Sequence, residues 1–110
     1  MHAFDVLGDP VRRRVLEALA ERERSAGELV EVVTEEFSIS QSAVSQHLRV
    51  LRDHGFATVR REGTRRIYAI DSAGVRQVDA WLEQFRGFWE NRLEALATEV
   101  ARGKRKKKPR

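Results

Sequence analysis

A run of short polar side chains is the part of this 110-residue sequence best suited to contacting a ligand. Within 38–55, amide, hydroxyl and guanidinium groups alternate with apolar residues that recur at the spacing of one helix face. Groups of these types read the edges of bases in the major groove of DNA. The alternative is a polar helix face that meets only solvent. The polar set comprises Gln41, Ser42, Ser45, Gln46 and Arg49, and the apolar set comprises Val44, Leu48 and Leu51.

Two helices are predicted before this polar helix. Asp9-Pro10 is typical of a helix start, with Asp as the N-cap and Pro in the first turn, and that helix runs to about Arg22. A short helix formed by the N-terminal residues precedes it. Ser25 and Glu28 form a capping box that begins the next helix, which we expect to end near Val33. Residues 34–38 then connect it to the polar helix, which gives a helix-turn-helix.

Three consecutive arginines lie in the first turn of the helix that begins at Pro10, where the helix dipole disfavours cations. One explanation is that Arg13 and Arg14 pair with Glu17, which lies at helical spacing from both. The other explanation is contact with phosphates.

A β-hairpin is predicted after Gly55, which closes the polar helix. Apolar and polar residues alternate along 57–70, and Glu62, Gly63 and Thr64 form the turn. We expect the arginines beside the turn to contact phosphates or the minor groove, the alternative being a solvated loop. These arginines are Arg60, Arg61, Arg65 and Arg66.

One long helix is predicted from about Ala73 to Ala101. Its apolar stripe is too wide for a domain of this size to cover, and large exposed apolar surfaces are usually association surfaces. We therefore expect a homodimer held by this helix and the N-terminal segment; packing within one chain is the alternative. The expected interface comprises Phe4, Leu7, Val78, Trp81, Leu82, Phe85, Phe88, Trp89, Leu93 and Leu96.

The positive charge is unevenly distributed. Residues 102–110 carry seven cations and no acid, while the remaining 14 Lys and Arg face 17 Asp and Glu, so that the body has a net charge of −3. Within the body, residues 40–66 hold six arginines and two acids, which is the footprint of a nucleic-acid face. We expect 1–101 to form the folded domain and 102–110 a disordered basic tail that binds phosphates or only aids solubility.

Four motifs in this order resemble the ArsR/SmtB family of winged-helix transcriptional repressors. They occupy 7–16, 27–29, 40–51 and 61–68. The resemblance implies a homodimer that is assembled through its terminal helices and binds an imperfect palindrome near a promoter. It also implies repression by blocking the polymerase. About four extra residues between Leu29 and Ser40 depart from the common family pattern and lengthen the predicted connection.

The metal ligands of metal-sensing family members are absent. The chain has no cysteine, and its only histidines are His2, His47 and His54, none of them on the last helix. We expect His47 to support its helix or touch DNA, and no metal or other cofactor to bind. A His–carboxylate metal site between subunits and release by a small-molecule effector, whose identity the sequence does not give, remain alternatives.

The predicted fold is mainly α with a small β-hairpin: a winged helix-turn-helix with a long C-terminal dimerisation helix. We expect a DNA-binding repressor whose partners are double-stranded DNA and a second copy. No nucleophile–base pair or phosphate-binding glycine loop suggests an enzyme. A protein–protein interaction module is the alternative, although the hairpin lacks apolar anchors. Without a signal peptide or an apolar span of about 20 residues, the expected location is the cytoplasm, with no membrane contact.

Overall fold

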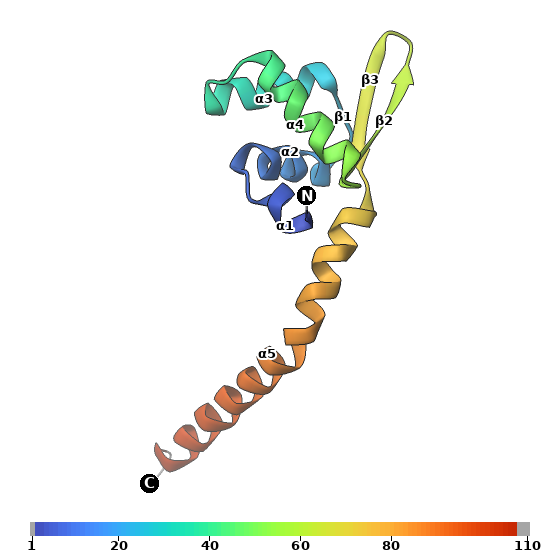
Figure 1. Cartoon of the computed structure of the whole chain (residues 1–110). Helices are drawn as coiled ribbons and strands as arrows, with labels where there is room; N and C mark the ends of the chain where they lie inside the picture. The colour runs from blue at the N-terminus through green and yellow to red at the C-terminus, as the bar shows by residue number, and fades with distance from the viewer. Residues whose placement is uncertain (1, 108–110) are drawn as a thin grey trace. The chain divides into compact units, whose positions relative to one another are not determined.

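The computed structural model describes residues 2–107, with side chains as far as Ala101. The chain forms two compact units that divide after Val78. The described elements, shown in Figure 1, are α1 (Ala3–Leu7), α2 (Pro10–Glu21), β1 (Arg24–Ser25), α3 (Ala26–Phe37), α4 (Gln41–Asp53), β2 (Ala57–Glu62), β3 (Arg65–Ile70) and α5 (Ser72–Lys107).

The predicted helix starts are confirmed by their capping bonds. The Asp9 carboxylate accepts hydrogen bonds from the backbone N–H groups of Val11 and Arg12, at 2.8 and 3.2 Å. At the start of α3, the Ser25 hydroxyl accepts from the Glu28 N–H at 3.2 Å, while the Glu28 carboxylate accepts from the Ser25 N–H at 3.0 Å. Each bond satisfies a donor that has no partner within the helix. These caps fix where the elements that carry the site begin.

The predicted end of α3 at Val33 is wrong, because the helix continues for another turn to Phe37. Phe37 lies one turn beyond Val33 and packs against the core, which favours the extra turn. The helix then stops at Ser38, whose φ of 53° is left-handed. The roughly four residues that this chain has in excess of the common family pattern therefore lengthen α3. Only residues 38–40 connect α3 to α4.

The predicted hairpin forms, together with a third strand that was not predicted. The sheet order is β1-β3-β2, and both pairings are antiparallel. Ala57 pairs with Ile70, and Glu62 pairs with Arg65 across the turn. The hairpin projects past the helices of the first unit (Figure 1).

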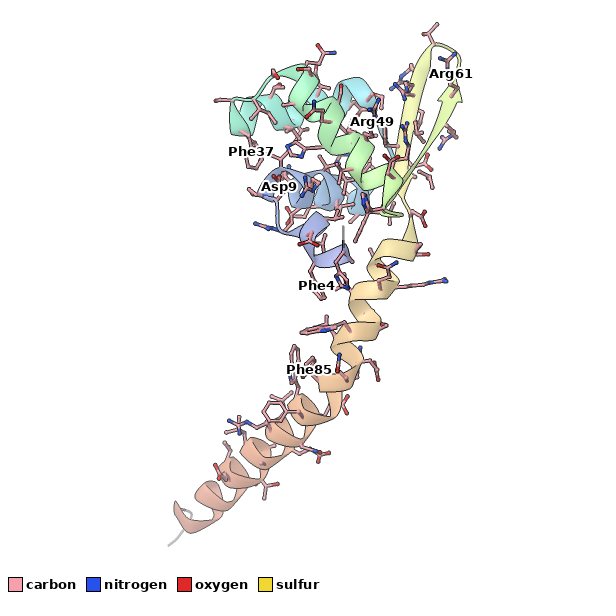
Figure 2. The ribbon with its side chains drawn as sticks, in the orientation of Figure 1. Phe4, Asp9, Phe37, Arg49, Arg61 and Phe85 are labelled. Atoms are coloured by element: carbon pink, nitrogen blue, oxygen red, sulfur yellow. The ribbon has the colours of Figure 1, made fainter. Side chains whose placement is uncertain are left out.

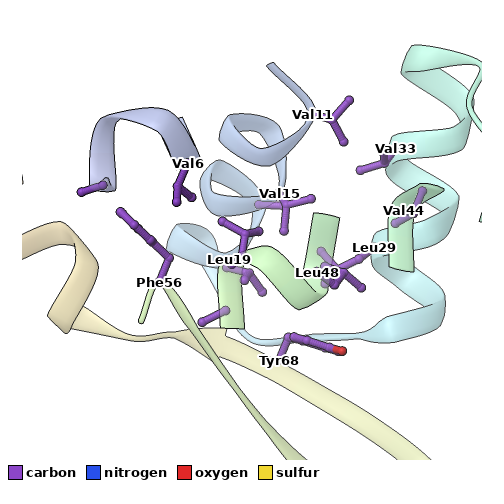
Figure 3. Packing of buried hydrophobic residues seen from close by; sticks show 14 residues of the cluster. Val6, Val11, Val15, Leu19, Leu29, Val33, Val44, Leu48, Phe56 and Tyr68 are labelled. Atoms are coloured by element: carbon purple, nitrogen blue, oxygen red, sulfur yellow. The ribbon is translucent and has the colours of Figure 1, made fainter. Parts of the chain in front are cut away.

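The core of the first unit lies where α2, α3 and α4 meet the sheet. Leu29, Leu51 and Phe56 are completely buried, and Figure 3 shows α2, α3 and the sheet contributing to one cluster. The predicted inward face of α4 is confirmed, since Val44 and Leu48 are also buried. The backbone leaves α4 through Gly55, which has a φ of +76°. The observed fold is the predicted winged helix-turn-helix with a long C-terminal helix.

The C-terminal helix α5 extends to Lys107, beyond its predicted end at Ala101. Residues 108–110 of the predicted tail lie outside the described residues. The apolar stripe of α5 is exposed along much of its length; Phe88, Trp89, Leu93 and Leu96 are each more than half exposed. Among the described residues, no helix combines the length and apolar character needed to cross a membrane.

Candidate nucleic-acid interface

The outward face of α4 carries the five polar residues that the sequence predicts as base-reading. Gln41, Ser42, Ser45, Gln46 and Arg49 are all exposed. Figure 2 shows Arg49 on the side of α4 that lies nearest to the hairpin. The burial of the opposite face holds this surface in place on the domain and leaves its amide, hydroxyl and guanidinium groups exposed, although the Ser42 hydroxyl also contacts that of Ser40 at 3.2 Å.

The predicted DNA contact His47 lies off this face. Its side chain is only 21% exposed. Its Nδ1 atom lies 3.3 Å from Nη1 of Arg12 and 4.0 Å from Oδ1 of Asp9. Of the two roles that the sequence suggests, the geometry favours support of the helix over contact with DNA.

The three arginines at the start of α2 have partners other than those predicted. Arg12 donates to the backbone oxygens of Val6 and Asp5 at 2.7 and 3.0 Å. Arg13 donates to the Leu7 oxygen at 2.8 Å, and the Nε atom of Arg14 donates to both carboxylate oxygens of Glu36. The predicted pairing with Glu17 is therefore replaced. Hydrogen bonds to carbonyl oxygens at the end of α1 explain why Arg12 and Arg13 are tolerated at the start of α2.

Two of the four hairpin arginines are held by carboxylates. Arg60 forms ion pairs with Glu23 at 2.9 Å and with Glu62 at 3.0 Å. Hydrogen bonds from Arg60 to these two carboxylates raise the pKa of its guanidinium further above its usual value. Arg65 lies 3.6 Å from Glu28. Sequence reasoning missed these partners because Glu23 and Glu28 are more than 30 residues away along the chain.

The other two hairpin arginines, Arg61 and Arg66, lie directly opposite each other on β2 and β3. Both are exposed, and neither forms an ion pair with any residue in the described part of the chain. Like charges placed opposite each other across two strands repel. The register also puts them on the same face of the hairpin as Val59 and Tyr68. This pair forms the unneutralised positive end of the hairpin, which Figure 2 marks at Arg61.

The carboxylates that cap helices beside this surface are stabilised in their charged form. Burial disfavours the charge of Asp9, but hydrogen bonds from the backbone of Arg12 and Val11 outweigh that effect, so that its pKa is lowered. The pKa of Glu28 is lowered by hydrogen bonds from the backbone and hydroxyl of Ser25, and then by Arg22. Both groups therefore remain negative and hold their helix starts in place.

Comparison with known proteins identifies the group to which this arrangement belongs. A family model described as a helix-turn-helix domain matches residues 7–60. The HTH-type transcriptional regulator Rv2034 of Mycobacterium tuberculosis is 35% identical over 95 residues, which cover 86% of this chain and 82% of that protein. The crystal structure of an ArsR family transcriptional regulator has a TM-score of 0.67 and 30% identity, covering 80% of this chain and 87% of the other. The chain belongs to the ArsR family.

Another solved structure similar to this ArsR-family chain is described as a homodimeric winged helix-turn-helix DNA-binding domain. It comes from Mycobacterium bovis and has a TM-score of 0.58 and 26% identity, with 74% of this chain and 71% of the other covered. Because the chain belongs to this family, its helices α3 and α4 form the helix-turn-helix of a DNA-binding transcription regulator. Among residues 2–107, no group of three or more His, Asp or Glu side chains is arranged to hold a metal.

Proposed function

We propose that this ArsR-family regulator binds double-stranded DNA as a homodimer, with the outward face of α4 in the major groove. The observation that carries the proposal is the exposed polar face of α4 beside the unpaired arginines Arg61 and Arg66. The 13 residues of α4 form a helix about 20 Å long, and the major groove, about 12 Å wide, admits a helix.

The side chains on this face have distinct proposed roles. The side-chain amides of Gln41 and Gln46 can pair with adenine, and the guanidinium of Arg49 can form two hydrogen bonds to guanine. The hydroxyls of Ser42 and Ser45 can contact adenine or guanine. The hairpin arginines contact the backbone or the minor groove. Such contacts supply affinity and hold the protein in register, whereas the α4 side chains supply sequence preference.

The second copy is proposed to dock on the apolar stripe of α5 and on the N-terminal helix. Along α5, Trp89 is 56% exposed and Leu93 is 66% exposed. The rings of Trp81 and Phe85 already contact each other in a tilted arrangement, with their centroids 4.7 Å apart and their planes at 51°. An obligate interface resembles a divided core, which suits a stripe of this composition. The homodimeric relative from Mycobacterium bovis supports the same assembly.

We further propose that the dimer is a repressor that does not sense metals and has no enzymatic activity. Repression is the direction that the family resemblance implies, because a dimer covering a promoter excludes the polymerase without needing another surface. The chain has no cysteine and no histidine after His54, so the usual thiolate and imidazole ligands of metal sensors are missing from it.

Selection of bound duplexes from a random pool tests the DNA-binding part of this proposal. The full chain should enrich a sequence with two half-sites that are related by a two-fold axis and spaced by about one helical turn or a multiple of it. Gln46→Ala and Arg49→Ala should each cost about 1–3 kcal/mol on the enriched duplex and relax the preference at one base pair. Gln77→Ala, an exposed glutamine on α5, is the control. Unchanged preference in both α4 variants would contradict the placement of the recognition helix.

Sedimentation equilibrium tests the dimer. The wild type should sediment as a dimer at micromolar concentration, and the double variant Phe85→Ala/Trp89→Ala should sediment as a monomer or unfold. Glu94→Ala, an exposed residue of the same helix, should remain a dimer. A folded wild-type monomer at that concentration would contradict the proposed assembly.

A further inference from the structure

A hollow of about 350 Å³ lies between the start of α3, the helix α4 and the strand β3. Its polar lining includes Arg49 and Arg52 from α4, and Arg66 and Tyr68 from β3. Gly27, in the first turn of α3, lines it from the third side and contributes no side chain. No carboxylate lines the hollow, so the only charged groups in its lining are arginine guanidiniums.

The three arginines of the hollow carry charges that the protein itself does not neutralise. Within the described residues, none of Arg49, Arg52 and Arg66 forms an ion pair. Arg66 also faces Arg61 across the strands, which adds repulsion that an anion would relieve. Arg60, on the other face of the hairpin, already has two carboxylates. The unneutralised charge is thus concentrated on the side of the hairpin that faces α4.

Tyr68 supplies a second, independent sign of a ligand. Its side chain is only 4% exposed, it lines the hollow, and its hydroxyl bonds to none of the described residues. Figure 3 shows this hydroxyl at the end of the ring that points away from Phe56, toward the side of the core where Leu29 and Val44 lie. No side-chain nitrogen or oxygen of the described residues is both fully buried and unpartnered, so the Tyr68 hydroxyl is accessible from the hollow although its ring is buried. From there it can donate a hydrogen bond to an acceptor that enters the hollow.

We propose that this hollow receives one phosphate group of the DNA backbone, an inference that rests on the DNA binding proposed above. The guanidinium groups of Arg52 and Arg66 match the geometry and charge of phosphate oxygens, while Arg49, which is proposed to pair with guanine, borders the same hollow. The hydroxyl of Tyr68 donates to one of these oxygens. Arg52 and Tyr68 thereby become binding residues, in addition to those that the sequence pattern indicates.

The position of the hollow favours a backbone phosphate over a free one. Gln41, Ser45 and Arg49 belong both to the lining of the hollow and to the base-reading face of α4. With α4 in the major groove and the hairpin against the adjacent minor groove, the strand that separates the two grooves passes between them. The hollow lies at that place on the protein. A phosphate bound there is covalently part of the duplex that α4 reads.

Two variants separate the charge from the hydroxyl. Arg52→Gln should reduce the slope of log affinity against log salt by about one for each subunit, because one phosphate contact is lost. Tyr68→Phe should weaken binding roughly tenfold per subunit with an unchanged slope, because a neutral hydrogen bond to a charged group is lost. Both losses should be equal for the enriched duplex and an unrelated one. Arg76→Gln, an exposed arginine on α5, is the matched control for charge.

Replacement of single phosphates by methylphosphonate identifies the bound group. On the duplex enriched by selection, one position in each half-site should weaken wild-type binding more than it weakens the binding of Arg52→Gln or Tyr68→Phe, because each variant has already lost one contact to that phosphate. The inference would be overturned if every methylphosphonate weakened the binding of all three proteins equally. It would also be overturned if both variants bound the unmodified duplex as tightly as the wild type does. Failure of the wild type to bind any duplex would instead overturn the proposed function.

Titration with inorganic phosphate distinguishes the two sources of the group. The side-chain NMR signals of Arg52 and Tyr68 should shift on addition of the duplex, and phosphate should displace it only at concentrations where added chloride of equal ionic strength does so too. Displacement by phosphate at far lower ionic strength would assign the hollow to a free phosphorylated ligand and contradict the backbone site.

Discussion

Nη1 of Arg12 lies 3.3 Å from Nδ1 of His47, and this contact joins the start of α2 to the middle of α4. Arginine has no acceptor, so in a hydrogen bond between these two groups the guanidinium donates and Nδ1 accepts. The same guanidinium binds the Val6 and Asp5 carbonyl oxygens at the end of α1. One side chain thus connects α1, which is proposed to belong to the dimer interface, with the helix proposed to read DNA.

Replacement of Arg12 by Ala should destabilise the first unit by about 1–3 kcal/mol, because the carbonyls of α1 and the His47 ring lose their donor. Urea unfolding followed by circular dichroism measures the change. Arg76→Ala, which removes an exposed arginine, should change the free energy of unfolding by less than about 0.5 kcal/mol. Equal effects of the two substitutions would show that the Arg12 contacts contribute nothing.

The cap at Asp9 makes stability depend on acid pH. Because its pKa is lower in the folded chain than the usual 3.8, its charge stabilises the fold above that value. That stabilisation is lost as the pH falls through the lower, folded value. Asp9→Asn keeps a capping oxygen but removes the charge, and should cost about 0.3–1 kcal/mol at pH 7. The difference from the wild type should shrink as the pH falls below 3.8 and through the folded value. Unfolding curves from pH 2 to 7 measure it, with the exposed Glu31→Gln as control; a gap that is constant with pH would contradict the assignment.

Gly74 is required where α5 begins. A Cβ added there would lie 2.6 Å from carbons of the Phe56 ring, and Phe56 is completely buried. The ring has no room to move aside, so Gly74→Ala should destabilise by about 1–3 kcal/mol despite the better helix propensity of Ala. At Gly87 of the same helix, nothing lies within 4 Å of an added Cβ. Gly87→Ala should therefore stabilise by up to about 1 kcal/mol. Melting temperatures that move in the same direction would contradict this contrast.

The parts of the fold that local patterns specify were predictable from the sequence. The Asp9-Pro10 start and the Ser25–Glu28 box each need only adjacent residues, and both are confirmed. The buried face of α4 follows from a periodicity that is set by one helix. These local signals also placed the residues proposed to read bases on the exposed face of α4.

Features that depend on distant residues were not predictable. β1 has two residues, too few to show alternation, and exists because it pairs with Tyr68 and Ile67. The extra turn of α3 depends on the packing of Phe37 against the core. Two hairpin arginines are neutralised and two are not, and this difference depends on Glu23 and Glu28. The partly buried position of His47 depends on its contact with Arg12. Such relationships are set by tertiary structure and leave no periodic trace in the sequence.

The basic segment 102–110 should add affinity without adding sequence preference. It carries seven cations, whereas the rest of the chain has a net charge of −3 and is repelled by DNA at long range. If three cations of each subunit neutralise phosphates, truncation after Ala101 should reduce the salt slope of the dimer by about five. Preference among duplexes should be unchanged, because contacts from lysine and arginine to phosphates carry no sequence information. An unaltered slope would leave the segment with a solubilising role only.

The two consecutive arginines of β2, Arg60 and Arg61, should differ sharply in their importance for DNA binding. Arg61 has no ion-pair partner in the described residues and shares a face with Arg66, whereas Arg60 is held by Glu23 and Glu62. A phosphate contact by Arg60 would first require breaking both ion pairs. Arg61→Ala should therefore reduce the salt slope by about two for the dimer and weaken all duplexes alike, while Arg60→Ala should leave the slope nearly unchanged. Fluorescence anisotropy with a labelled duplex at several salt concentrations measures both. A larger change for Arg60→Ala than for Arg61→Ala would mean that the hairpin presents its other face to DNA.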